Sequence, residues 1–129
     1  MPINIRKLTD NLGVEILNLD LASALDDRTI QEIEDLFLQY QILYFGQQTI
    51  NPTEHVQFGQ LFGELQVHVM KQYHDNENPE LYRLSNIGQD GKPNGIVPDQ
   101  GTHVWHPDAS WQEYTGQATT IYCERTTSK

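Results

Sequence analysis

Two helix-start signals, separated by one short apolar run, constrain the fold of this 129-residue chain more than any other feature. Asp26 is a typical N-cap residue, and large apolar and aromatic side chains follow it at helical spacing as far as Tyr40. A second helix is predicted from Asn51, because Glu54 stands three residues later and completes a capping box. The apolar run at residues 42–46 is then predicted to be a buried strand between two amphipathic helices.

Runs of β-branched and alternating apolar residues predict further strands in both halves of the chain. These runs lie at residues 3–8, 13–21, 65–69, 81–87, 103–108 and 119–125. Residues 88–102 are rich in glycine, proline and asparagine, which predicts a long loop. The pattern predicts an α+β fold that is mainly β, and the length predicts one domain over residues 1–129.

The charge balance restricts the classes of partner. The chain has 8 Lys and Arg against 18 Asp and Glu, a net charge of −10. Such a surface repels the phosphates of nucleic acids and acidic lipid headgroups, so no nucleic-acid or membrane partner is expected. The N-terminus has no apolar signal-peptide core, and the single cysteine cannot form an internal disulfide. We therefore expect a cytoplasmic protein.

The stretch "VWHPDASW" contains the strongest candidate for a metal site. On a strand, His106 and Asp108 would project from the same face, because side chains two residues apart point the same way. An imidazole nitrogen beside a carboxylate oxygen provides two of the three protein donors of a facial triad, which leaves open positions on Fe(II). The spacing alone also fits an ordinary polar strand end.

Two other interpretations of this stretch remain open. The tripeptide His106-Pro107-Asp108 also marks the chaperone-stimulating J-domain, but that domain has a basic helix where this chain has a glycine- and proline-rich loop. His103 could complete a zinc site, although on a strand it would face away from the pair. The remaining candidate donors are expected to be two solvated histidines and a small core residue, namely His55, His74 and Cys123.

The order of the motifs resembles the taurine/2,4-D dioxygenase (TauD/TfdA) family of Fe(II)- and 2-oxoglutarate-dependent enzymes. The resemblance extends over almost the whole chain. It is carried by "GVEILNLDL", by the helix leading into "QILYFGQQTINP", by "FGQLFGEL" and by "WHPDASW". Pro107 departs from the family, which has threonine or serine there, and this change could re-aim the ligand strand.

The resemblance implies a fold, a reaction and site residues. It implies the N-terminal part of a double-stranded β-helix (a jelly roll of the clavaminate synthase type) with two flanking helices. It also implies Fe(II) as cofactor, with 2-oxoglutarate and O₂ as co-substrates. In the implied reaction a small, acidic organic molecule is hydroxylated, and succinate and CO₂ are released. His106 and Asp108 would be the iron ligands, and His68 and Thr102 would face the substrate.

The same resemblance implies residues that this sequence does not contain. The second iron-binding histidine, and a threonine and an arginine that hold 2-oxoglutarate, would follow Lys129. We therefore expect the 129-residue chain to be inactive alone, and to self-associate through strand edges and apolar faces that a complete barrel covers. The alternative is a non-catalytic remnant of the fold that acts as a binding module.

Overall fold

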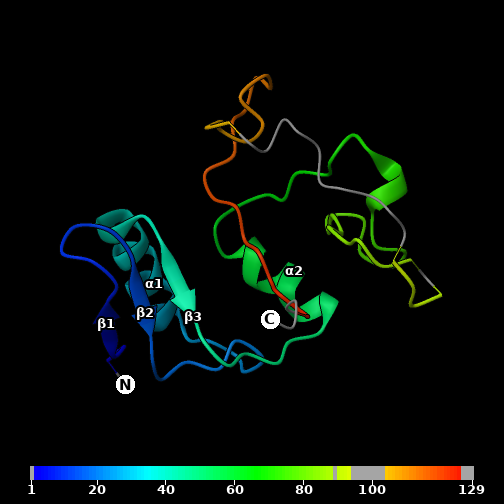
Figure 1. Ribbon diagram of the computed structural model, residues 1–129. Coiled ribbons are helices and arrows are strands. Elements are labelled where there is room, and N and C mark those ends of the chain that lie inside the picture. The colour runs from blue at the N-terminus through cyan, green and yellow to red at the C-terminus, as the bar shows by residue number, and fades with distance from the viewer. Residues whose placement is uncertain (1, 89, 94–103, 126–129) are drawn as a thin grey trace. The chain divides into compact units, whose positions relative to one another are not determined.

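The structure is a computed structural model that describes residues 2–88, 90–93 and 104–125 (Figure 1). The chain divides into two compact units, Met1–Gly63 and Glu64–Lys129, which are described separately here. The expectation of one domain over residues 1–129 stays a prediction. Among the described residues, no helix is both long and apolar enough to cross a membrane.

A three-stranded sheet forms one layer of the first unit. Its strands are β1 (Ile5–Lys7), β2 (Val14–Ile16) and β3 (Leu43–Phe45), in the order β1-β2-β3. β2 pairs antiparallel with β1 and parallel with β3. Val14 and Ile16 lie two positions apart on β2, so both point to the same face, and both are buried. The strands expected at residues 3–8, 13–21 and 42–46 are confirmed, with shorter bounds.

Helix α1 (Asp27–Tyr40) connects the parallel strands β2 and β3 and lies against the sheet (Figure 1). Its N-terminus is capped by Asp26, whose carboxylate accepts a 2.8 Å hydrogen bond from the Thr29 backbone N–H. The helix ends where Gln41 takes a left-handed conformation with φ 64°. Ile33, in the middle of the helix, is buried against the sheet side of the unit. The predicted first helix is confirmed.

Helix α2 (Pro52–Gln60) has the capping box expected from its sequence. The Asn51 side chain accepts from the Glu54 backbone N–H, and the Glu54 carboxylate accepts from the Asn51 N–H. The buried Phe58 brings this helix into the core and makes edge-to-face contacts with two other rings. The core of the first unit consists of Ile3, Val14, Ile16, Ile33, Tyr40 and Phe58.

The second unit differs from the sequence prediction. Its described residues form one 3₁₀-helix, η1 (Lys71–Tyr73), and two isolated β-bridges, His74↔Tyr82 and Ile87↔Pro93. The strands expected at residues 65–69, 81–87 and 119–125, and in the described part of 103–108, are absent from the part of the chain that the structure describes.

The cause of this difference is the lack of a ladder partner. A strand requires a neighbouring strand that satisfies its backbone N–H and C=O groups. Val67 and Val69, expected on one face of a strand, are 50% and 63% exposed, so the described residues cover them only in part. Alternating sequence therefore did not suffice to form a strand here.

Candidate functional site

The imidazole of His106 and the carboxylate of Asp108 lie together in the second unit. Nε2 of His106 is 3.5 Å from Oδ1 of Asp108, and the two side chains are 45% and 62% exposed. Both side chains are thus accessible to a ligand, and their nearest donor atoms face each other. The sequence predicted that this pair would project together, and the geometry agrees.

The pair does not lie on a strand, so the expectation that both residues belong to one strand was wrong. Residues 108–111 form a turn directly after Pro107. Ala109 takes a positive φ of 53°, and its carbonyl accepts a 3.0 Å hydrogen bond from the Gln112 N–H. Pro107 donates no backbone hydrogen bond, which favours a turn over a ladder position.

Each side chain of the pair is also held by a second partner. Nδ1 of His106 lies 2.8 Å from the carbonyl oxygen of Val104. Because a carbonyl can only accept, Nδ1 carries the proton and the Nε2 lone pair of the neutral ring is available. On the carboxylate, Oδ2 of Asp108 accepts a 3.0 Å hydrogen bond from the Thr119 hydroxyl. No sequence pattern indicated a role for Thr119, which lies in a segment predicted to be a strand.

The arrangement of the pair fits a divalent transition metal. Nε2 of His106 and Oδ1 of Asp108 would be the atoms that hold such an ion, because both side chains are accessible and these atoms lie close together. One imidazole nitrogen and one carboxylate oxygen suit Fe(II), and an outer hydrogen bond on each ligand is typical of metal sites. Within the described ranges, no group of three His, Cys, Asp or Glu side chains could hold an ion. The described residues therefore offer two protein donors.

His68, the predicted substrate-facing residue, lies outside this pair and outside any strand. Its Nδ1 accepts a 3.1 Å hydrogen bond from the Met70 backbone N–H. Its ring lies against Tyr82, with 4.4 Å between centroids, and its carbonyl oxygen lies 2.6 Å from Nε2 of His74. The imidazole is exposed, but the Met70 N–H contacts one edge of the ring and Tyr82 contacts one face.

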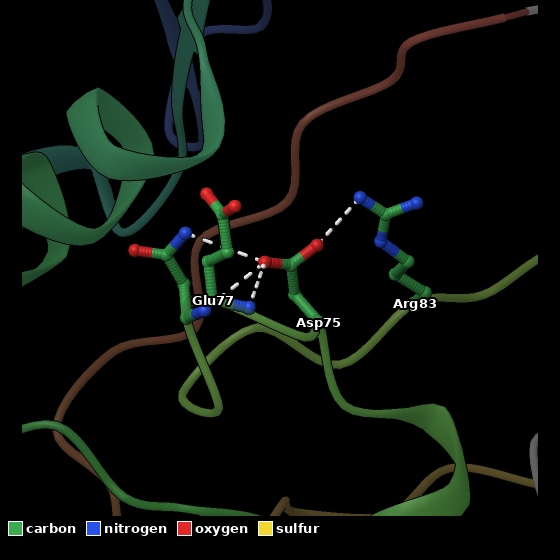
Figure 2. A network of polar contacts seen from close by, with 4 residues as sticks. Asp75, Glu77 and Arg83 are labelled. Carbon is green, nitrogen blue, oxygen red and sulfur yellow. Dashed lines mark hydrogen bonds and ion pairs between the residues drawn. The ribbon is translucent and has the colours of Figure 1, made fainter.

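A network of polar contacts around Asp75 lies in the segment that carries Tyr82, the aromatic partner of His68 (Figure 2). One carboxylate oxygen of Asp75 contacts Arg83 at 2.6 Å, and the other accepts hydrogen bonds from the backbones of Glu77 and Asn78. Burial raises the pKa of Asp75, but these hydrogen bonds and that from the Asn78 side chain outweigh it and hold the pKa below its usual value. The network joins the two ends of residues 75–83, and the sequence did not suggest it.

The other candidate residues have different surroundings. Thr102 and His103 lie outside the described residues. His55 is half-buried on α2, and burial lowers the pKa of its imidazole. His74 is half-buried as well, so the expectation of two fully solvated histidines was wrong. Cys123, expected in the core, is exposed, because the segment around it forms no strand.

The family model for taurine catabolism dioxygenase TauD, TfdA family matches residues 4–129. The chain belongs to this family. The TauD/TfdA match extends over both compact units and includes His68, His106 and Asp108. The resemblance that the sequence motifs indicated is therefore confirmed.

Individual relatives agree with the family. The chain is 27% identical over 124 residues to the alpha-ketoglutarate-dependent 2,4-dichlorophenoxyacetate dioxygenase of Burkholderia sp. (strain RASC), covering 88% of this chain and 41% of that protein. It is 44% identical over 62 residues to an alkylsulfatase of Acinetobacter baylyi, covering 47% of this chain and 20% of that one.

A solved taurine dioxygenase from Burkholderia xenovorans has a similar fold. The TM-score is 0.59 at 28% sequence identity, over 64% of this chain and 29% of that chain. The α+β arrangement of a small sheet with two helices is thus consistent with part of the TauD/TfdA fold. This chain spans less than half the length of each of these relatives.

Proposed function

We propose that this chain carries part of the active site of an Fe(II)- and 2-oxoglutarate-dependent dioxygenase, with His106 and Asp108 as two of the metal ligands. The observation that carries the proposal is the 3.5 Å approach of Nε2 and Oδ1, in a chain whose family match includes both residues. We further propose that the two units belong to one jelly-roll domain in the complete fold.

The chemistry of the bound metal is that of the family. When bound, Fe(II) would activate O₂. One oxygen atom of O₂ is used as 2-oxoglutarate is converted into succinate and CO₂, and the second is inserted into a C–H bond of the co-substrate. In this chain, the Nδ1–H of His106 points to the Val104 carbonyl, so Nε2 is the nitrogen that would bind the ion. Asp108 offers one negative charge, which partly neutralises the cation.

We propose that His68 and Thr102 line the side of the cavity that binds the co-substrate. In support, the contacts of the His68 ring are with the Met70 backbone N–H and the Tyr82 ring, and neither of these groups is a carboxylate or a metal ligand. The co-substrate is a small organic molecule, most simply an organic acid. The family name and the relatives suggest a panel of a sulfonate, an alkyl sulfate and a phenoxyacetate.

The experiment is succinate release by the purified complete protein with Fe(II), 2-oxoglutarate and each member of this panel. The Asp108→Ala variant should lose turnover, whereas Glu113→Ala should keep it, because Glu113 is an exposed acid on the same segment. Retention of turnover by Asp108→Ala would reject the assignment of the ligand pair.

The alternative is a non-catalytic binding module built from the same fold. Such a module would need no third metal donor, and the described residues provide none. If the complete protein bound members of the panel but released no succinate with any of them, the binding module would be the better account.

A further inference from the structure

The hydroxyl of Thr119 contacts the carboxylate of Asp108 from a segment 11 residues further along the chain. The contact is a 3.0 Å hydrogen bond from Oγ1 to Oδ2. This side-chain contact joins the turn after His106 to residues near 119, and it is separate from the hydrogen bond within the turn.

This contact distinguishes the two oxygens of the carboxylate. Rotation about the last side-chain bond of an aspartate is loosely restricted, and Asp108 is exposed, so packing alone does not fix the plane of the group. With Oδ2 accepting from Thr119, the other oxygen, Oδ1, is the one directed at Nε2 of His106. The Val104 carbonyl fixes the imidazole in the same way from the other side.

We propose that Thr119 is a positioning residue for the metal site. Its hydroxyl holds Oδ2, so that Asp108 binds the ion through Oδ1 alone and the remaining positions on the metal stay open for co-substrates. This inference rests on the proposed function, because it assigns a role toward the metal that His106 and Asp108 would bind. Outer hydrogen bonds of this kind typically change metal affinity by about 10- to 100-fold.

The test measures metal affinity without turnover, using Mn²⁺ as a paramagnetic probe that accepts nitrogen and oxygen ligands. Mn²⁺ is titrated into the complete protein, and broadening of the His106 ring resonances in NMR spectra gives a dissociation constant even when binding is weak. Thr119→Val removes the hydroxyl at similar volume, and we expect it to weaken Mn²⁺ binding about tenfold. Thr119→Ser keeps the hydroxyl and should bind as the parent does.

Thr115→Val is the matched control, since Thr115 is exposed like Thr119 and lies on the same segment. It should leave Mn²⁺ binding unchanged. Equal affinities for Thr119→Val and the parent, with binding lost in Asp108→Ala, would overturn the role of Thr119 and leave the ligand pair standing. Parent-like broadening of His106 in Asp108→Ala would overturn the ligand pair itself, and with it this inference.

Discussion

The protonation of single imidazoles determines what each histidine of this chain can do. His106 and His68 have opposite arrangements, because Nδ1 of His106 faces a carbonyl oxygen and Nδ1 of His68 faces a backbone N–H. In the neutral rings, His106 therefore presents a lone pair at Nε2 and His68 presents an N–H there. The first suits a metal ligand and the second suits a donor to an oxygen of the co-substrate.

We predict that His68→Ala raises KM for the co-substrate about two- to tenfold, the equivalent of one hydrogen bond, with kcat and iron content nearly unchanged. The measurement is steady-state kinetics of the complete protein, with iron determined by elemental analysis. His68→Gln should recover part of the loss, because its amide N–H can take the place of the Nε2–H. Loss of iron in His68→Ala would show that His68 is a ligand instead.

His55 should make stability depend on pH. Burial lowers the pKa of its imidazole from the ordinary value of 6.5. The unfolded chain then binds a proton at a higher pH than the folded chain, so the free energy of unfolding should fall as pH drops below that value. Urea unfolding at about pH 7.5 and pH 5.5 measures this dependence, which His55→Gln should reduce. An unchanged pH dependence in His55→Gln would contradict the assignment.

At this scale, the sequence predicted that His106 and Asp108 lie together but not what orients them. Their spacing was sufficient for this, although the two residues do not lie on a strand. Thr119 could not be predicted, because its contact with Asp108 depends on the path of the intervening chain. A hydroxyl has no sequence pattern that indicates such a partner.

Among the elements, both helices follow from local interactions in the sequence. The strands predicted in the second unit depend on partners elsewhere in the chain, and they did not form. Helix α2 begins at its capping box, which is encoded within four consecutive residues from Asn51 to Glu54. A strand near residues 65–69 would need a partner from elsewhere in the fold, and alternation in the sequence cannot name that partner. Local signals thus predicted α1 and α2 correctly and overpredicted strands.

We predict that Asn51→Ala lowers the free energy of unfolding by about 0.5–2 kcal/mol, the usual cost of losing an N-cap. The substitution removes the acceptor of the 2.9 Å hydrogen bond from the Glu54 N–H, whereas the 2.7 Å bond from the Asn51 backbone N–H to the Glu54 carboxylate does not require the Asn51 side chain. Urea denaturation followed by circular dichroism measures the change. Gln57→Ala on the exposed face of α2 is the control and should cost little. Equal stability of both variants would mean that the box does not stabilise the chain.

For the whole molecule, the apolar surface around the ligand pair is the dominant feature. Trp105 is 105% exposed, and large apolar or aromatic side chains are exposed on both sides of the pair, namely Val104, Trp111 and Tyr114. Exposed groups of this kind mark surfaces that another part of a protein or another molecule covers. The sequence indicated this only in outline, because it predicted buried strands here.

We predict that the 129-residue chain self-associates at micromolar concentration. Light scattering over a dilution series measures the mass, and replacing Trp105 and Trp111 with serine should shift it toward the monomer. The control replaces Leu38 with serine. Leu38 is an exposed apolar side chain of the first unit, remote in sequence from His106 and Asp108. A monodisperse monomer at all concentrations would refute the prediction.

The central claim is that His106 and Asp108 bind the metal of a TauD/TfdA dioxygenase. The most direct measurement is anomalous diffraction at the iron edge from crystals of the protein grown anaerobically with Fe(II) and 2-oxoglutarate. The account predicts a peak about 2.0–2.2 Å from Nε2 of His106 and Oδ1 of Asp108. An iron peak bound by other side chains, with neither of these atoms in contact, would contradict it.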